Sequence, residues 1–220
     1  QSTLIQAVSG VAGDLIDHVP VSRFAPMGVL EDITEFAAEN GLDPARNYPG
    51  AASLLTSGGR QYAFPCNLAA RGLLVNLDTF AEYGVEPPPE EWTPEEFERI
   101  GLEFTRRANA GKARQEVFFA GPMPGMILPL ARSLGGDVFN ETMTASALAS
   151  PAFEKALSLY CRWSGELKLI PAASDIASES ADSSSANGEA TPQLMRGRYG
   201  MIPTGRYVNM DLRRSPRGTF

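Results

Sequence analysis

The segment from Thr93 to Ala108, "TPEEFERIGLEFTRRA", constrains the fold of this chain more than any other. Thr93 suits the N-cap position, Pro94 suits the first helical position, and Glu96 completes a capping box. Apolar residues then recur at helical spacing along one face, namely Phe97, Ile100, Gly101, Phe104 and Ala108. The sequence therefore predicts an amphipathic helix with one buried face.

Strands and further helices alternate around this helix. "GLLV", residues 72–75, predicts a buried strand, and "TFAEY" predicts a short helix that Asp78 caps. Ser150–Pro151 repeats the cap-then-proline device before a helix whose buried face is predicted to hold Phe153, Ala156, Leu157, Tyr160 and Cys161. The segment from Ala172 to Thr191 is poor in large apolar residues and predicts a mobile surface loop. Strands that alternate with helices predict a layered α/β fold, in which ligands bind at the carboxyl ends of strands and in interdomain crevices.

The composition excludes several classes of function. The 19 basic residues against 26 acidic residues leave no electrostatic footprint for a nucleic acid. One histidine and two distant cysteines exclude an imidazole-rich zinc site and a disulfide framework. No phosphate-binding glycine loop and no nucleophile elbow occurs, so we expect no cofactor and no metal. No stretch approaches the ~20 apolar residues of a membrane span.

The apolar run "AFPCNLAARGLLVN", residues 63–76, contains in its middle two polar side chains that a buried strand would ordinarily avoid. Asn67 and Arg71 therefore need partners. One interpretation is that Arg71 pairs with a structural carboxylate and Asn67 closes a turn. The other is that the strand crosses between two lobes, where both side chains meet a solute.

The segment "MIPTGRYVNM" places a glycine, a guanidinium and an aromatic ring side by side. Gly205 lets a ligand approach the backbone, and Arg206 and Tyr207 offer a hydrogen-bonding group beside a flat ring. This combination suits a sugar, which has an apolar face and a hydroxylated rim. The alternative is that Tyr207 fills the core and Arg206 is a solvated turn residue.

The segment "GDLIDHV" predicts a short buried strand or the turn after it, and it carries Asp14, Asp17 and His18. In a strand, alternation sends Asp14 and His18 to one face and Asp17 to the other, so the three do not form a metal site. A turn aspartate is the favoured interpretation, and hydrogen bonding of a solute by Asp14 is the next.

Taken in order, several segments resemble the extracellular solute-binding proteins of ABC importers, family 1, the sugar-binding family that includes the maltodextrin-binding protein. The segments that carry the resemblance are "GVAGDLID", "GVLEDITEF", "GGRQYAFP", "LLVNLDTFAEYGVEPPPEEWTPEEF", "LGGDVFN", "SPAFEKALSLY" and "MRGRYGMIPTGRY". They cover nearly the whole chain.

The resemblance implies a periplasmic-binding-protein-like α/β fold of two lobes joined by crossing hinge strands, and no enzyme activity. It implies capture of a carbohydrate or similar hydroxylated solute by hinge closure in the interlobe cleft, and delivery to a membrane permease. Asn67 and Arg71 would line the hinge side of the cleft. Tyr207 stands where family members usually have a sugar-stacking tryptophan, and Asp14 matches an aspartate at the mouth of the first lobe. The family further implies a monomer in the periplasm or outside the cell, with or without a lipid anchor.

Two departures from the family pattern qualify these expectations. Ala69 stands where maltodextrin binders have an acidic residue, which argues against that ligand. Family members are also much longer, so we expect a partial chain in which residues 1–70 are part of lobe I and residues 71–220 are most of lobe II.

An alternative from a different class is a hydrolase that uses Cys66 as nucleophile and His18 as base. It requires the two side chains to lie within hydrogen-bond reach of each other.

Overall fold

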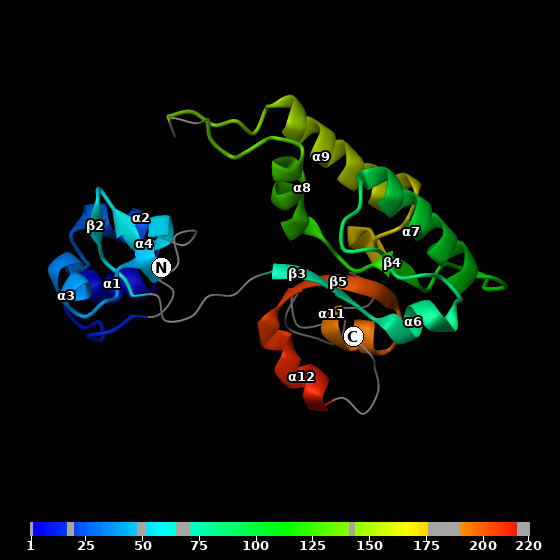
Figure 1. The fold of residues 1–220 in the computed structure, drawn as a ribbon, viewed down its shortest axis with the longest axis horizontal. Helices are drawn as coiled ribbons and strands as arrows, with labels where there is room; N and C mark the ends of the chain where they lie inside the picture. The colour runs from blue at the N-terminus through cyan, green and yellow to red at the C-terminus, as the bar shows by residue number, and fades with distance from the viewer. Residues whose placement is uncertain are drawn as a thin grey trace. The chain divides into compact units, whose positions relative to one another are not determined.

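The fold is described from a computed structural model, which describes residues 2–16, 20–47, 52–64, 71–140, 144–175 and 190–214. The contacts divide the chain into a first unit, residues 1–68, and a second unit, residues 69–220. Each unit is described by itself (Figure 1). The assignment of these units to the two predicted lobes stays a prediction.

The first unit consists of short helices and one small hairpin. Its elements are α1 (Ser2–Val8), α2 (Val21–Phe24), the 3₁₀ helix η1 (Ala25–Met27), α3 (Thr34–Glu39), α4 (Pro44–Asn47), α5 (Ala52–Leu55), β1 (Thr56–Ser57) and β2 (Arg60–Gln61). Gly58 and Gly59 have φ angles of 58° and 76°. Both values lie in the left-handed region that glycine adopts without strain, which allows the tight turn between β1 and β2.

No buried strand forms over residues 14–16, although the sequence allowed one there. Leu15 is 89% exposed and Asp14 is exposed as well. A strand of this kind would bury its apolar residues, so the turn is the correct interpretation of these three residues. Asp17 and His18 lie outside the described residues.

The second unit combines a three-stranded sheet with helices, which confirms the predicted α/β class. Its elements are β3 (Arg71–Val75), α6 (Leu77–Glu82), α7 (Pro94–Ala108), β4 (Phe118–Ala120), η3 (Pro124–Met126), α8 (Ile127–Ser133), α9 (Pro151–Cys161), the π-helix η4 (Arg162–Glu166), α11 (Ala190–Met195), β5 (Tyr199–Gly205), η6 (Arg206–Val208) and α12 (Asn209–Arg214). The strand order is β3-β5-β4, with β3 antiparallel and β4 parallel to β5.

The predicted amphipathic helix is α7, and its capping box is confirmed. The Glu96 backbone N–H donates to Thr93 Oγ1 over 3.2 Å, and the Thr93 N–H donates to Glu96 Oε2 over 2.8 Å. All five residues of the predicted apolar stripe are buried. Trp92 packs on Phe97 with ring centroids 5.3 Å apart, which is the hydrophobic staple expected across such a cap.

Helices lie over both faces of the sheet in the second unit (Figure 1). On one face, Val75 and Met201 pair across the strands and pack into the large core with Phe104 of α7. On the other face, Leu74 and Ile202 pair and pack with Leu194 of α11, together with a smaller set of residues. The sheet is thus the middle layer between α7, α8 and α9 on one side and α11 on the other.

Two predictions about helix details are wrong. Asn76, not Asp78, is the N-cap of α6, because its Oδ1 accepts a hydrogen bond from the Thr79 N–H. Cys161 is exposed at the end of α9, and Leu157 is 51% exposed. The face of α9 that packs on the core holds the buried Ala156 and the half-buried Leu159 and Tyr160, and Trp163 of η4 continues it.

The predicted surface loop between Ala172 and Thr191 falls largely on residues 176–189, which lie outside the described residues.

Candidate functional site

The pairing of β3 with β5 brings four predicted site residues to one end of the sheet. Arg71, the first residue of β3, lies directly opposite Gly205, the last residue of β5. Arg206 and Tyr207 follow at once as the first residues of η6. Residues that are far apart in the sequence are therefore neighbours here, and we call these four residues the Arg71–Tyr207 cluster.

The polar and aromatic side chains of this cluster are available to a ligand. Arg71 and Arg206 are exposed, and Tyr207 is 65% exposed. Among the described residues, neither guanidinium forms a hydrogen bond or an ion pair. The alternative in which Tyr207 fills the core is wrong, because a core tyrosine would be buried.

Gly205 itself is buried, and its φ of −114° is open to any residue. Its backbone geometry therefore does not require glycine, and the close approach of a ligand to this backbone stays a prediction.

The remaining predicted site residues do not belong to the described part of the second unit. Asp14 belongs to the first unit, where it is exposed between α1 and α2. Asn67 lies outside the described residues, and so do Cys66 and His18 of the hydrolase hypothesis.

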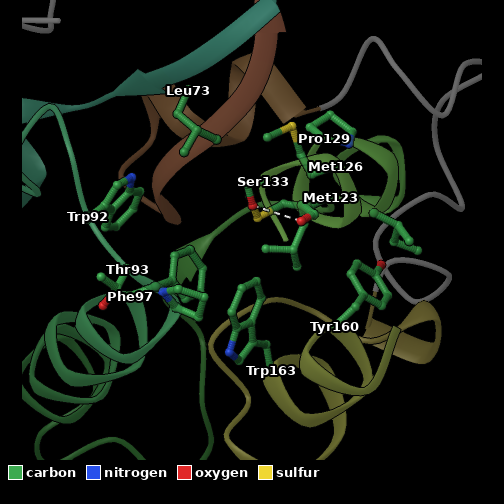
Figure 2. A pocket seen from close by; sticks show the side chains of 13 residues that line it. Leu73, Trp92, Thr93, Phe97, Met123, Met126, Pro129, Ser133, Tyr160 and Trp163 are labelled. Atoms are coloured by element: carbon green, nitrogen blue, oxygen red, sulfur yellow. Dashed lines mark hydrogen bonds between the residues drawn. The ribbon is translucent and has the colours of Figure 1, made fainter. Parts of the chain in front are cut away.

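The second unit also contains a cavity that the sequence analysis missed. Its volume is about 280 Å³. Its walls come from β3, the start of α7, η3 with α8, and α9 with η4 (Figure 2). The lining residues are Leu73, Trp92, Thr93, Pro94, Phe97, Met123, Met126, Ile127, Pro129, Leu130, Ser133, Tyr160 and Trp163. We call this space the aromatic cavity.

Hydrogen bonds within the protein already occupy most polar atoms at the walls of the aromatic cavity. Ser133 Oγ donates to Leu130 O over 2.8 Å, and Trp163 Nε1 donates to Glu98 Oε1 over 3.0 Å. Thr93 Oγ1 accepts from the α7 backbone at the cap. Burial raises the pKa of the Tyr160 hydroxyl above its ordinary value, with a smaller contribution from Cys161, so Tyr160 is neutral at pH 7. The cavity thus offers mainly rings and aliphatic groups.

The aromatic cavity lies next to the Arg71–Tyr207 cluster. Leu73, which lines the cavity, follows Arg71 by two positions on β3, so both side chains point to the same face of the sheet. A Cβ atom at Gly125 would lie 3.5 Å from Arg71 Nη1. The guanidinium therefore lies near Gly125 of η3, and the next residue of η3, Met126, lines the cavity.

Trp92 and Trp163 are the signal by which the sequence could have indicated the cavity. Trp92 precedes the N-cap of α7, where a hydrophobic residue commonly packs on the helix, and this staple is present. The same ring also borders the cavity, together with Trp163, which stacks on Phe97 at a centroid distance of 4.2 Å. A residue that staples a helix can therefore line a cavity as well.

Neither a metal centre nor a membrane helix is found in the part of the chain that the structure describes. Its histidines, cysteines, aspartates and glutamates form no group of three that could hold an ion. None of its helices combines the length and the apolar character that a membrane span requires.

Comparison with known families identifies the chain. Residues 2–211 match the family described as bacterial extracellular solute-binding protein. The chain belongs to this family. Its members are solute-binding proteins rather than enzymes, which confirms the expectation that this chain is not an enzyme. Family membership therefore argues against the hydrolase alternative. Membership also confirms the predicted class of location, which is the periplasm or the outside of the cell. Comparison with curated proteins gives no match.

Solved structures show the same fold. An ABC substrate-binding protein from Listeria monocytogenes, in complex with cycloalternan, has 22% identity and a TM-score of 0.79, over 98% of this chain and 53% of that chain. A solute-binding protein from Thermotoga lettingae, bound with α-D-tagatose, has 19% identity and a TM-score of 0.72, over 99% and 55%. UgpB from Mycobacterium tuberculosis, in complex with glycerophosphocholine, has 16% identity and a TM-score of 0.68, over 90% and 47%.

The predicted periplasmic-binding-protein fold is thereby confirmed. The chain spans about half the length of these solved structures.

Proposed function

We propose that this chain is part of the substrate-binding component of an ABC importer, and that it takes up a carbohydrate or a similarly hydroxylated solute. The observation that carries the proposal is the Arg71–Tyr207 cluster. It presents two guanidinium groups without a described partner and one exposed aromatic ring at a single end of the β3–β5 pair.

The chemistry of the cluster supports a sugar. An exposed tyrosine ring can pack on the apolar C–H face of a pyranose, and guanidinium groups can donate to its hydroxyl oxygens. The similar structures from Listeria monocytogenes and Thermotoga lettingae hold cycloalternan and tagatose, both of which are carbohydrates. Their ligands support the proposal for this chain but do not identify the sugar.

Hinge closure is the mechanism that we propose for capture. In this proposal Asp14 and Asn67 contact the solute from one lobe, and Arg71, Arg206 and Tyr207 contact it from the other. A solute that makes more contacts in the closed state shifts the population toward that state. A permease in the membrane would then recognise the closed form of a monomeric protein in the periplasm or at the cell surface, with or without a lipid anchor.

An acidic or phosphorylated solute is the second candidate. Two exposed guanidinium groups without a described partner favour it, because a guanidinium pairs with carboxylate and phosphate in a bidentate geometry. UgpB, which has a similar fold, holds a glycerophosphodiester. The two candidates differ in how strongly their binding depends on charge and salt.

The test is calorimetric titration of the full-length protein with neutral sugars, uronic acids and sugar phosphates. We expect Tyr207→Ala to weaken binding of the captured solute by about tenfold, the change produced by losing ~1.4 kcal/mol of contact. Phe139→Ala is the matched control, because Phe139 is also an exposed aromatic residue of the second unit but is distant in sequence from the cluster. Unchanged affinity in Tyr207→Ala would exclude the site.

The arginines separate the two candidates in the same titration. Arg71→Gln should weaken the binding of an acidic solute much more than the binding of a neutral one. Arg106 is an exposed arginine in the last turn of α7, so Arg106→Gln should change neither affinity. Equal losses for both kinds of solute would favour the neutral sugar.

A further inference from the structure

The aromatic cavity has the composition of a ligand site rather than of a packing defect. Rings form much of its wall, contributed by Trp92, Phe97, Tyr160 and Trp163 (Figure 2). The ring contacts Trp92–Phe97 and Phe97–Trp163, at 5.3 Å and 4.2 Å, fix the position of three of these rings. A wall of mutually packed rings is already organised for another ring.

Water is a poor occupant of this cavity. A buried water needs two to four polar partners, and three of the five polar side chains at the wall, those of Thr93, Ser133 and Trp163, are already bonded within the protein. An apolar cavity of about 150 Å³ is large enough to bind benzene. A cavity of about 280 Å³ therefore has room for a six-membered ring with a substituent.

The cavity and the Arg71–Tyr207 cluster can be reached by one ligand. Two residues along a strand span about 7 Å, which is the distance between Arg71 at the cluster and Leu73 at the cavity wall. Arg71 Nη1 also lies near η3, 3.5 Å from the position that a Cβ atom on Gly125 would take, and Met126 of η3 lines the cavity. A few covalent bonds therefore suffice to link a polar group near Arg71 to a ring in the cavity.

We propose that the aromatic cavity is a second subsite of the solute site, and that the solute carries an aromatic or similarly apolar ring beside its hydroxylated part. The inference rests on the proposed function, because it concerns the same solute. Arg71 lies at the boundary, where it contacts the polar part of the solute while the ring enters between Leu73, Phe97 and Met126.

The experiment compares methyl and phenyl glycosides of the same sugars, namely glucose, galactose, mannose and glucuronic acid, on the full-length protein. Calorimetry gives both affinities. Tryptophan emission is a second readout, because both tryptophans of this chain, Trp92 and Trp163, line the cavity. We expect the phenyl glycoside of the preferred sugar to bind about tenfold more tightly than its methyl partner. We also expect only the phenyl glycoside to shift the tryptophan emission of the second unit.

Leu130→Trp tests the location, because a larger side chain at this wall position would fill the cavity. The phenyl-to-methyl affinity ratio should fall to about one in this variant. Leu102→Trp is the matched control, since Leu102 is exposed on α7 and lies away from the cavity wall, and it should keep the ratio. If Leu130→Trp does not fold, Ile127→Phe changes the same wall by a smaller volume.

The possible outcomes separate the two proposals. Equal affinity of methyl and phenyl partners in the unmodified protein overturns the second subsite and leaves the sugar-binding function standing. A preference for phenyl that Leu130→Trp and Ile127→Phe both retain also overturns it. If no glycoside of either series binds, the proposed function fails, and the inference about its solute fails with it.

Discussion

Each of the two units is stabilised internally by a different kind of interaction. The second unit has a large core of buried rings and aliphatic side chains from α6, α7, β4, η4, β5 and the segments that connect them. In the first unit, the described buried apolar side chains are Val21, Phe24, Ala37 and Pro44. Gln61, which is only 5% exposed, connects separate segments of the first unit through hydrogen bonds. One unit therefore relies on apolar burial and the other relies more on a few polar contacts.

The polar contacts of the first unit centre on Gln61 and Thr34. Gln61 Nε2 donates to the carbonyl oxygens of Leu42 and Ala63, over 3.1 Å and 3.0 Å. The Gln61 N–H donates to Thr34 Oγ1 over 2.9 Å. A hydrogen bond depends on the relative orientation of its two groups, and removing one partner leaves the other buried without a bond. A large apolar core instead distributes its stability over many contacts.

The largest effect should come from the core of the second unit. Phe104→Ala removes a fully buried ring that contacts Phe80, Tyr83 and Phe119, so we expect a loss of about 3–5 kcal/mol in the free energy of unfolding. Urea denaturation followed by tryptophan emission measures it, because both tryptophans lie in the second unit. Leu102→Ala, 45% exposed on the same helix, should cost less than about 1 kcal/mol. Similar losses in both variants would contradict the burial of α7.

The next effect is confined to the first unit. Gln61→Ala leaves two carbonyl oxygens without their donor, so we expect the local stability of the first unit to fall by about 1–3 kcal/mol. Amide hydrogen exchange over residues 20–64 should become faster, while the tryptophan-detected transition stays in place. Gln6→Ala, at an exposed position of α1, is the matched control. A shift of the tryptophan-detected transition would show that the polar network also stabilises the second unit.

A smaller effect should follow from removing the cap of α7. Thr93→Ala deletes the oxygen that accepts from the Glu96 N–H, which should cost about 1 kcal/mol. Thr93→Ser keeps this oxygen and should restore most of the loss. Thermal unfolding of the three proteins compares them, and an alanine variant as stable as the unmodified protein would show that the staple of Trp92 on Phe97 suffices by itself.

The smallest effect concerns a carboxylate of the first unit. The hydroxyl of Thr34 lowers the pKa of Asp32 by donating to it over 2.6 Å, and the Thr34 N–H and Arg60 add to this shift. Because the folded-state pKa is depressed, the contribution of Asp32 is present above its ordinary pKa and disappears as the pH falls through the lowered one. The hydrogen-exchange protection factors of residues 31–37 should therefore fall on acidification below about pH 4. In Asp32→Asn this acid dependence should be weaker, and an unchanged dependence would assign it to another group.

Local patterns predicted the elements that depend on near neighbours. The capping box and the stripe of α7 lie within sixteen consecutive residues, and every predicted contact of the cap is present. The face of α9 was less predictable, because Leu157 and Cys161 are exposed and the helix continues as the π-turn of η4, which brings Trp163 into the core. Periodicity alone does not indicate where such a turn begins.

The candidate site divides in the same way. The residue types of the Arg71–Tyr207 cluster could be selected from the sequence, but the register that sets Arg71 opposite Gly205 could not. Strand partners are a property of the fold, and a shift by one residue would turn each side chain to the other face. Trp92 and Trp163 could have indicated the aromatic cavity, but its shape could not be predicted, since its wall combines residues from β3, α7, α8, α9 and their flanking turns.

The long sequence separation of β3 and β5 has a consequence for when the protein becomes competent to bind. The Asn76 side chain, just after β3, donates to the carbonyl of Leu194, which lies 118 positions further along the chain. Such a contact closes a long loop and pays its entropic cost before it returns any stability, so it forms late relative to local helices. Binding by the Arg71–Tyr207 cluster would therefore appear only in molecules that have completed this step. Solute binding would then report complete folding of the second unit, whereas helix content would already be high in partly folded molecules.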